Sequence, residues 1–150
     1  MHYEFTTLAE LLYYTQKTAG NAIKGFCRFG LLTEATAQAV KAILNEGSQV
    51  YELLVESDSI RHTLAQHGIA KAKAEIARRQ IPIIETDLLD LANWLHQPTA
   101  VRAGQAKPGK QPRIEMQRET ATGTTVAIVE WRPGRQQLAL VTMYKKKPAA

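Results

Sequence analysis

The chain has 150 residues, 45% hydrophobic and 22% charged, which is the composition of a globular domain large enough to bury its own core. Its single cysteine, Cys27, excludes an intramolecular disulfide and a cysteine-based zinc site. No apolar run approaches the roughly 20 residues of a membrane-spanning helix. We therefore expect a soluble protein without a membrane span.

The net charge of +5 is unevenly distributed along the chain. Residues 101–150 hold ten Lys or Arg and three Glu, a net +7, which leaves −2 for the first hundred residues. A basic segment of this kind is typical of proteins that bind a polyanion such as nucleic acid, because neutralised phosphates release counterions. A solvated basic surface without a ligand accounts for the asymmetry equally well.

Residues 1–47 have a helical pattern throughout. Thr7 and Glu10 have the spacing of a capping box, and Thr33 precedes a segment with one apolar face, so both threonines are predicted to begin helices. A short helix is predicted between them, at residues 22–29. Aromatic residues at helical spacing are expected in the core rather than stacked on bases.

The middle of the chain is predicted to contain two further helices. Residues 50–57 fit a strand or a helix, and Ser57 or Asp58 is expected to cap a helix that ends at Gly68. A basic helical or loop segment follows. Thr86 is then expected to cap a helix that stops before Pro98.

Beyond residue 99 the pattern changes to alternating strands separated by turns. The residues of a basic loop, 102–112, precede three alternating segments that end with the last strand, QLALVTMYKK. Helices followed by an antiparallel sheet predict an α+β fold. We divide the chain into a helical N-terminal segment, residues 1–47, and a second part, residues 48–150.

The last strand has hydroxyl side chains near its end. Alternation predicts one face with Leu138, Leu140, Thr142 and Tyr144 and another with Ala139, Val141 and Met143. Lys145 and Lys146 follow directly. A hydroxyl, a phenol and an ammonium close together can bind a phosphate and stabilise charge on its oxygens. An ordinary strand end with surface residues has the same pattern.

Two histidines lie in the sequence RHTLAQHG. His62 and His67 are five positions apart, about 140° around an ideal helix, so a regular helix does not place them on one face. They can share a pocket if the helix ends at Gly68 and His67 turns out on the last turn. Two imidazoles in different protonation states suit the acid and base of RNA transesterification. Two unrelated surface histidines are the alternative.

Three segments in this order resemble the motifs of a nuclease superfamily. RHTLAQHG, EIARRQIPIIETDLLDLANWL and VAIVEWRPGRQQLALVTMYKKK are similar to the small nucleases of the barnase, EndoU, colicin and RelE superfamily. Phages carry these nucleases on head proteins, and bacteria carry them on polymorphic toxins, including those of contact-dependent growth inhibition. The resemblance spans roughly residues 50–147, which makes residues 48–150 the nuclease domain.

The resemblance implies roles for particular residues. His62 and His67 become the general acid and base, and Thr142 and Tyr144 bind or orient the scissile phosphate. The resemblance adds Arg61, Glu75 and Arg78 as substrate-binding candidates, beside Arg132, Lys145 and Lys146 of the last two strands. The chain departs from the family pattern at Arg79, where we expect glycine, and a different turn there would put the roles of Glu75 and Arg78 in doubt.

The implied activity is that of a metal-independent endoribonuclease toxin that leaves a 2′,3′-cyclic phosphate and needs no metal and no cofactor. Its RNA substrate, with transfer RNA among the candidates, lies in the cytoplasm of a target bacterium. The nuclease would be delivered there as part of a larger secreted or virion-borne protein. The implied state is a monomer or a heterodimer with an acidic cognate immunity protein. Glu130 is either structural, paired with Arg132 or Arg135, or a base.

Two other classes of function remain open at this stage. In a non-catalytic nucleic-acid-binding or phage structural module, the basic strands would only hold phosphates. A third hypothesis is an interaction protein with an incidental basic surface, and only the helical N-terminus supports it. Residues 1–47 have no counterpart in the resemblance and are a linker, a delivery segment or helices that complete the fold.

Overall fold

A computed structural model describes residues 2–18 and 24–148 and confirms the α+β class. None of the helices it describes is both long and apolar enough to cross a membrane. The helices are α1 (Leu8–Lys17), α2 (Glu34–Leu44), α3 (Ser57–His67), α4 (Ala72–Ala77) and α5 (Glu85–Trp94), with short 3-10 turns at Ile69–Lys71 and Pro133–Arg135. The strands are β1 (His2–Glu4), β2 (Lys24–Leu31), β3 (Glu52–Glu56), β4 (Gln80–Ile81), β5 (Ala100–Ala103), β6 (Arg113–Thr120), β7 (Gly123–Arg132) and β8 (Gln137–Lys146).

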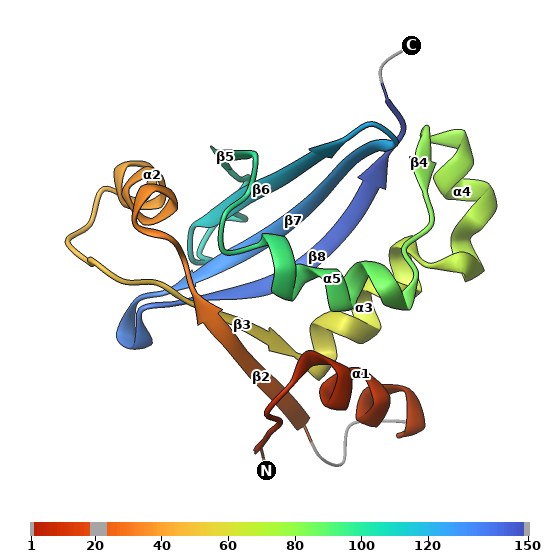
Figure 1. The fold of residues 1–150 in the computed structure, drawn as a ribbon, viewed down its shortest axis with the longest axis horizontal. Coiled ribbons are helices and arrows are strands. Elements are labelled where there is room, and N and C mark those ends of the chain that lie inside the picture. The colour runs from red at the N-terminus through yellow and green to blue at the C-terminus, as the bar shows by residue number, and fades with distance from the viewer. Residues whose placement is uncertain (1, 19–23, 149–150) are drawn as a thin grey trace.

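The strands form one mixed sheet in the order β1-β2-β3-β8-β7-β6-β5, and β4 pairs with the end of β8. The pairs β1–β2 and β3–β8 are parallel, whereas the other pairs are antiparallel. Helices alternate with strands along the chain (Figure 1), so the predicted order of helices first and sheet second is wrong. The division of the chain after residue 47 stays a prediction.

The largest correction is β2, which replaces the helix predicted at residues 22–29. Residues 22 and 23 lie outside the described part, but the remainder is a strand that pairs antiparallel with β3, with Cys27 opposite Val55. Both residues are buried in the core. Aromatic residues favour a pleated, half-buried strand, glycine disfavours a helix, and pairing with β3 decides between the two.

Two of the predicted helix caps are confirmed. The Thr7 hydroxyl accepts a hydrogen bond from the backbone N–H three residues later, at 3.2 Å, and Thr33 does the same at 3.4 Å. Such a cap contributes about 1 kcal/mol. The predicted caps of the next two long helices are wrong, because α3 begins at Ser57 without a side-chain cap and α5 begins at Glu85, ahead of Thr86.

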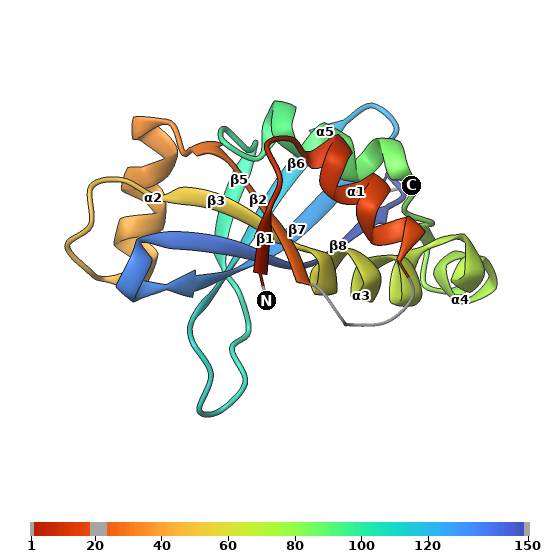
Figure 2. The same cartoon turned by 90° about the horizontal axis from the view of Figure 1, so that it is seen from below.

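The two faces of the sheet differ in what lies against them. Helices α1 and α5 lie on one face, and the loop between β5 and β6 extends from the opposite side (Figure 2). The helix-covered face contributes apolar side chains of β6, β7 and β8 to the core: Ile114, Met116, Ala127, Val129, Leu138, Leu140 and Met143. We call the opposite face, which carries Glu115, Ile128, Glu130, Thr142 and Tyr144 on these three strands, the open face.

Candidate functional site

A β-bulge in β8 sets which side chains reach the open face. Thr142 is opposite Ile128, but Leu140 is opposite Val129, so Val141 is an extra residue in the ladder. An extra residue reverses the alternation beyond it. Met143 therefore joins Leu140 in the core. Thr142 and Tyr144 share a face as predicted, but the prediction that Leu138 and Leu140 share it with them is wrong.

His67 lies beside Tyr144. It is the last residue of α3, and its ring centroid is 5.6 Å from that of Tyr144, with the ring planes tilted by 38°. The backbone holds it there, because the His67 carbonyl accepts a hydrogen bond from the Ile83 N–H at 2.7 Å. The helix end thus brings the histidine motif and the last strand together.

Gly68 makes this helix end possible. A Cβ at this position would lie 2.3 Å from the Leu64 carbonyl oxygen, far inside contact distance. The Gly68 N–H donates to the same carbonyl at 3.0 Å and closes the last turn of α3. Any other residue would have to shift the backbone that carries His67, which gives the His-Gly pair in the sequence a physical reason.

Glu115, which the sequence analysis did not single out, lies on the open face in the same row as Thr142. Glu115 is opposite Ile128 on β7, and Ile128 is opposite Thr142 on β8. The Gln117 amide donates to the Glu115 carboxylate at 2.5 Å. The alternation of Ile114 and Met116 predicts that Glu115 points outward, but the register that aligns it with Thr142 is not readable from the sequence.

Burial, and secondarily the negative charge of Glu115, raise the pKa of Tyr144 above its ordinary value. The phenol therefore stays protonated near neutral pH and can donate a hydrogen bond. The Thr142 hydroxyl is buried and has no hydrogen-bond partner among the described residues. The imidazole and the phenol are in contact, and a carboxylate and a second hydroxyl lie on the same face; groups of these kinds can transfer protons and stabilise an oxyanion.

The other histidine of the motif lies apart from this group. His62 is exposed on α3, about 140° around an ideal helix from His67. Its neighbour Arg61 is tied to the N-terminal part of the chain: its guanidinium lies 3.3 Å from the Asp58 carboxylate and donates to the Thr18 hydroxyl at 3.2 Å.

The segment around α4 keeps the turn that a glycine would favour. Arg79 has a φ of 60°, in the left-handed region, and its carbonyl accepts from the Lys147 N–H at 3.0 Å. Arginine thus adopts here the conformation that glycine adopts without strain, and it bears the conformational cost. Arg78 is exposed beside it. The backbone of Glu75 belongs to α4, but its side chain lies outside the described part.

The two lysines after Tyr144 point to opposite faces. Lys145 follows the alternation of Met143, and its ammonium is 2.9 Å from the Asp87 carboxylate of α5 on the helix-covered side. Lys146 lies on the same side as Tyr144, with its ammonium 5.6 Å from the centroid of the phenol ring. Of the two, only Lys146 is placed to meet a ligand at Tyr144.

Arg132 lies at the other end of the open face. It is six residues along β7 from Val126, the partner of Tyr144, which is about 20 Å in a strand. Its guanidinium donates to the Glu56 carboxylate at 2.7 Å. No ion pair in the described part of the chain joins Glu130 to Arg132 or Arg135, although the hydrogen bond to Glu56 and then the charges of Glu56 and Glu130 raise the pKa of Arg132.

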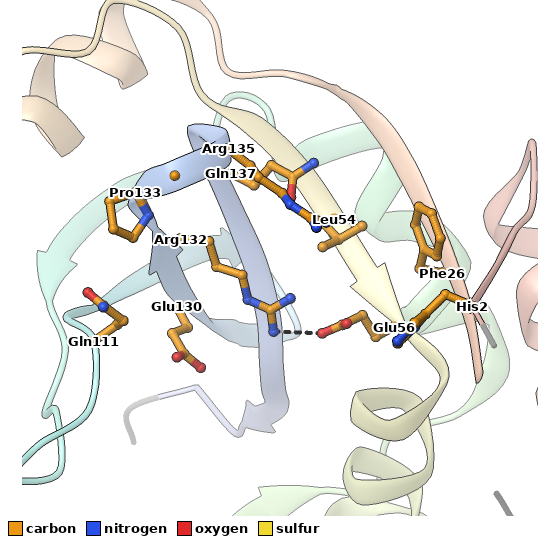
Figure 3. A pocket seen from close by; sticks show the side chains of 11 residues that line it. His2, Phe26, Leu54, Glu56, Gln111, Glu130, Arg132, Pro133, Arg135 and Gln137 are labelled. Atoms are coloured by element: carbon orange, nitrogen blue, oxygen red, sulfur yellow. Dashed lines mark hydrogen bonds and ion pairs between the residues drawn. The ribbon is translucent and has the colours of Figure 1, made fainter. Parts of the chain in front are cut away.

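A cavity of about 780 Å³ opens at this end of the face (Figure 3). It is bordered by β2, β3, the start of β8 and the end of β7. Figure 3 shows that Arg132 points toward Glu56 and that the Glu130 carboxylate points away from that pair. The open face thus has two separate polar regions: the group of His67, Glu115, Thr142 and Tyr144, and this cavity.

Metal binding has no evident ligand set in the described residues. No group of three or more His, Cys, Asp and Glu side chains lies close enough together in that part of the chain to hold a metal ion. Cys27 is buried in the core, and burial, followed by the charges of Glu4 and Glu10, raises the pKa of its thiol to about 11.

Comparison with known families places the chain among the nucleases similar to barnase, EndoU, colicins E5 and D, and RelE. The particular family is described as phage-Barnase-EndoU-ColicinE5/D-RelE like nuclease3, and its model matches residues 31–150. The match covers more than half of the chain, so the chain belongs to this family and the resemblance seen in the sequence is confirmed. No curated protein and no solved structure matches the chain.

Proposed function

We propose that the chain is an endoribonuclease that cleaves RNA without a metal ion, at the group formed by His67, Thr142 and Tyr144. The observation that carries the proposal is the contact between His67 and Tyr144, which joins two motifs far apart in the sequence on the open face of the sheet. The family supplies the reaction class, a nuclease, and the ribose 2′-hydroxyl supplies a nucleophile within the substrate.

The proposed reaction is an in-line transesterification. A general base removes the proton of the 2′-hydroxyl, whose oxygen attacks the adjacent phosphorus. The bond from phosphorus to the 5′-oxygen breaks, and a general acid protonates that oxygen. The products are a 2′,3′-cyclic phosphate and a 5′-hydroxyl, and the enzyme returns to its starting protonation state after one proton is exchanged with water.

His67 is one of the two proton-transfer groups, because imidazole changes charge close to neutral pH. Thr142 and Tyr144 donate hydrogen bonds to the non-bridging oxygens of the phosphate, where negative charge builds up. The second proton-transfer group is Glu115 or His62. Glu115 is favoured because it lies in the same row as Thr142 and because its negative charge contributes to the raised pKa of Tyr144.

Basic side chains surround this group without acidic partners of their own. Arg102 is opposite Glu115 on the neighbouring strand, and Arg113 is two residues along β6, so both belong to the open face. Neither forms an ion pair with a described acidic residue, and the Nε of Arg113 is buried without a hydrogen-bond partner there. Unpaired guanidinium groups of this kind bind phosphates.

The test is cleavage of total bacterial RNA in EDTA by the parent and by two histidine variants, His67→Ala and His62→Ala. We expect His67→Ala to lower the cleavage rate about 10²- to 10⁴-fold, the usual contribution of a general acid or base. His62→Ala is the matched control on the same helix. Glu115→Gln should cause a similar loss if Glu115 is the second group.

Two further readouts make the test specific. Cleaved RNA should end in a cyclic phosphate, and an oligonucleotide with a single 2′-deoxy residue at the cut site should resist cleavage because its nucleophile is missing. Cleavage of DNA, a requirement for added metal, or full activity of His67→Ala would each contradict the proposal.

We infer that the nuclease acts as a toxin, with transfer RNA among its candidate substrates, and that a cognate immunity protein covers the open face. The net +7 of residues 101–150 favours an acidic inhibitor. Expression of the parent in bacteria should stop growth, whereas His67→Ala should be tolerated. Co-expression of the acidic immunity protein should restore growth, and a partner that binds without inhibiting cleavage would contradict the inference.

A further inference from the structure

The cavity near Arg132 is large enough for a planar ligand and is not part of the proposed cleavage group. Its volume, about 780 Å³, lies in the range of small-molecule sites. It lies on the same face as Tyr144, about 20 Å away along β7. The side chains that matter for recognition are Phe26, Leu54, Gln111, Glu130, Arg135 and Gln137 (Figure 3).

Two acceptors in this cavity lack hydrogen-bond partners among the described residues. Gln137 is only 7% exposed; its amide N–H donates to Glu52 at 3.0 Å, but its carbonyl oxygen is buried and unpartnered. The Glu130 carboxylate forms no ion pair in that part of the chain, and Arg132 is neutralised by Glu56. The half-buried Glu130 carboxylate lines the cavity and can accept hydrogen bonds from a ligand that brings N–H donors, whereas the Gln137 oxygen has almost no accessible surface.

The remaining lining favours a flat ligand over a phosphate. Phe26 presents a half-buried aromatic ring and Leu54 an apolar surface, and a carboxylate beside them would repel a phosphate. A nucleobase has an aromatic face for stacking and an edge with N–H donors and acceptors. The exposed donors of Arg135 and Gln111 at the rim can meet the acceptors of that edge.

We propose that this cavity binds one unstacked base of the RNA, several nucleotides from the phosphate held at Tyr144. The position of that phosphate rests on the proposed function, whereas base binding in the cavity does not require cleavage. The unpaired Arg113, directly opposite Glu130 on the neighbouring strand, lies between the two regions and can hold an intervening phosphate.

The experiment measures binding and needs no cleavage. The probe is a fluorescent 2′-O-methyl RNA of about twelve nucleotides, whose blocked 2′-oxygen cannot react. A matched probe of equal length has abasic residues, so it keeps the phosphates and lacks the bases. Affinities of both probes are measured by fluorescence anisotropy at fixed salt, because phosphate contacts depend strongly on salt.

The sign of the effect of Glu130→Gln decides the proposal. Removing a carboxylate near RNA strengthens attraction for phosphates in general, but it weakens a bond to base N–H groups. We expect about tenfold weaker binding of the base-containing probe and no weakening for the abasic probe. Glu119→Gln, the same charge change at an exposed position near the far end of β6, should weaken neither probe.

Phe26→Leu is the second variant, because it keeps an apolar side chain and removes the stacking surface. It should weaken the base-containing probe about five- to tenfold and leave the abasic probe unchanged. Unchanged or tighter binding of the base-containing probe by Glu130→Gln would overturn the proposal, as would equal losses for both probes. A parent that binds as expected but cleaves no RNA would contradict the nuclease proposal alone.

Discussion

The two faces of β8 contain different kinds of residue, although they belong to one strand. On the helix-covered side Leu138, Leu140 and Met143 are almost fully buried in an apolar core. On the open side, Thr142 and Tyr144 are half-buried among ionisable groups. Side chains on the covered face therefore contribute to the stability of the fold, whereas side chains on the open face are available for chemistry. Changes on the two faces should affect different measurements.

The largest effect is expected from Met143→Ala on the covered face. Met143 has no exposed surface, so the loss of its side chain should leave a cavity and lower the free energy of unfolding by about 2–5 kcal/mol. Urea denaturation would measure the loss. Met143→Leu, which conserves volume, should cost less than about 1.5 kcal/mol. A tenfold loss of RNA cleavage per folded molecule in Met143→Ala would show that the two faces are coupled.

Tyr144→Phe on the open face should have the opposite profile. Without its phenol hydroxyl, the site loses one donor to the phosphate, and we expect cleavage to fall about 10- to 100-fold with kcat more affected than KM. Unfolding should change by less than about 0.5 kcal/mol. Tyr13→Phe, at an exposed position of α1, is the control for both measurements. Equal activity of Tyr144→Phe and the parent would remove Tyr144 from the reaction.

A third change acts away from both faces, in the loop between α2 and β3. The Glu46 carboxylate accepts hydrogen bonds from Ser48, at 2.9 Å from the N–H and 2.6 Å from the hydroxyl, and from the Tyr51 hydroxyl. Burial tends to raise the pKa of Glu46, but the hydrogen bonds from Ser48 and Tyr51 outweigh it, so the pKa is lowered. Glu46→Gln should cost about 1 kcal/mol at neutral pH.

The pH dependence of that cost has a defined sign. A carboxyl whose pKa is lowered by folding stabilises the protein above its ordinary pKa, and the contribution disappears as the pH falls through the folded-state pKa. The difference in unfolding free energy between the parent and Glu46→Gln should therefore shrink toward acid pH. A difference that stays constant from neutral to acid pH would contradict this account, and cleavage per folded molecule should be unchanged throughout.

The smallest effect is expected at the left-handed turn. Arg79→Gly should raise the free energy of unfolding by about 0.5–1 kcal/mol, because glycine adopts the positive φ without strain but adds freedom to the unfolded chain. Arg78→Gly is the neighbouring control, and it should lower stability because its φ is not positive. Thermal unfolding of the two variants should move in opposite directions.

The sequence predicted the elements whose signals are local. The hydroxyl caps at Thr7 and Thr33, the end of α3 before Gly68 and the C-terminal antiparallel strands depend on neighbouring residues, and the structure contains all of them. The strand β2 was not predicted, since its partner β3 is more than twenty residues away and its aromatic residues also fit a helix. Parallel pairing of β3 with β8 is non-local for the same reason.

Part of the candidate site follows from the sequence, and part requires the register. His67 and Tyr144 could be named as partners, because a histidine before a helix-ending glycine and a tyrosine near a strand end stand out in the sequence. Glu115 could not be predicted as a site residue, because the sequence shows only that it points outward. The register of β6, β7 and β8 is needed to place it in the row of Thr142. The alternation of the last strand already places Lys145 opposite to Tyr144, but its ion pair with Asp87 required knowledge of the neighbouring helix.

The extra residue at Val141 decides where β8 can lose a residue. Leu140 and Thr142 are opposite Val129 and Ile128, which are neighbours on β7, so removal of Val141 would leave an unbroken ladder with Met143 still in the core and Tyr144 still on the open face. Removal of Met143 would instead place Tyr144 opposite Ala127 and turn it toward the core. Among relatives, a gap at Val141 is thus compatible with the Thr-Met-Tyr arrangement, whereas a gap inside those three letters is not.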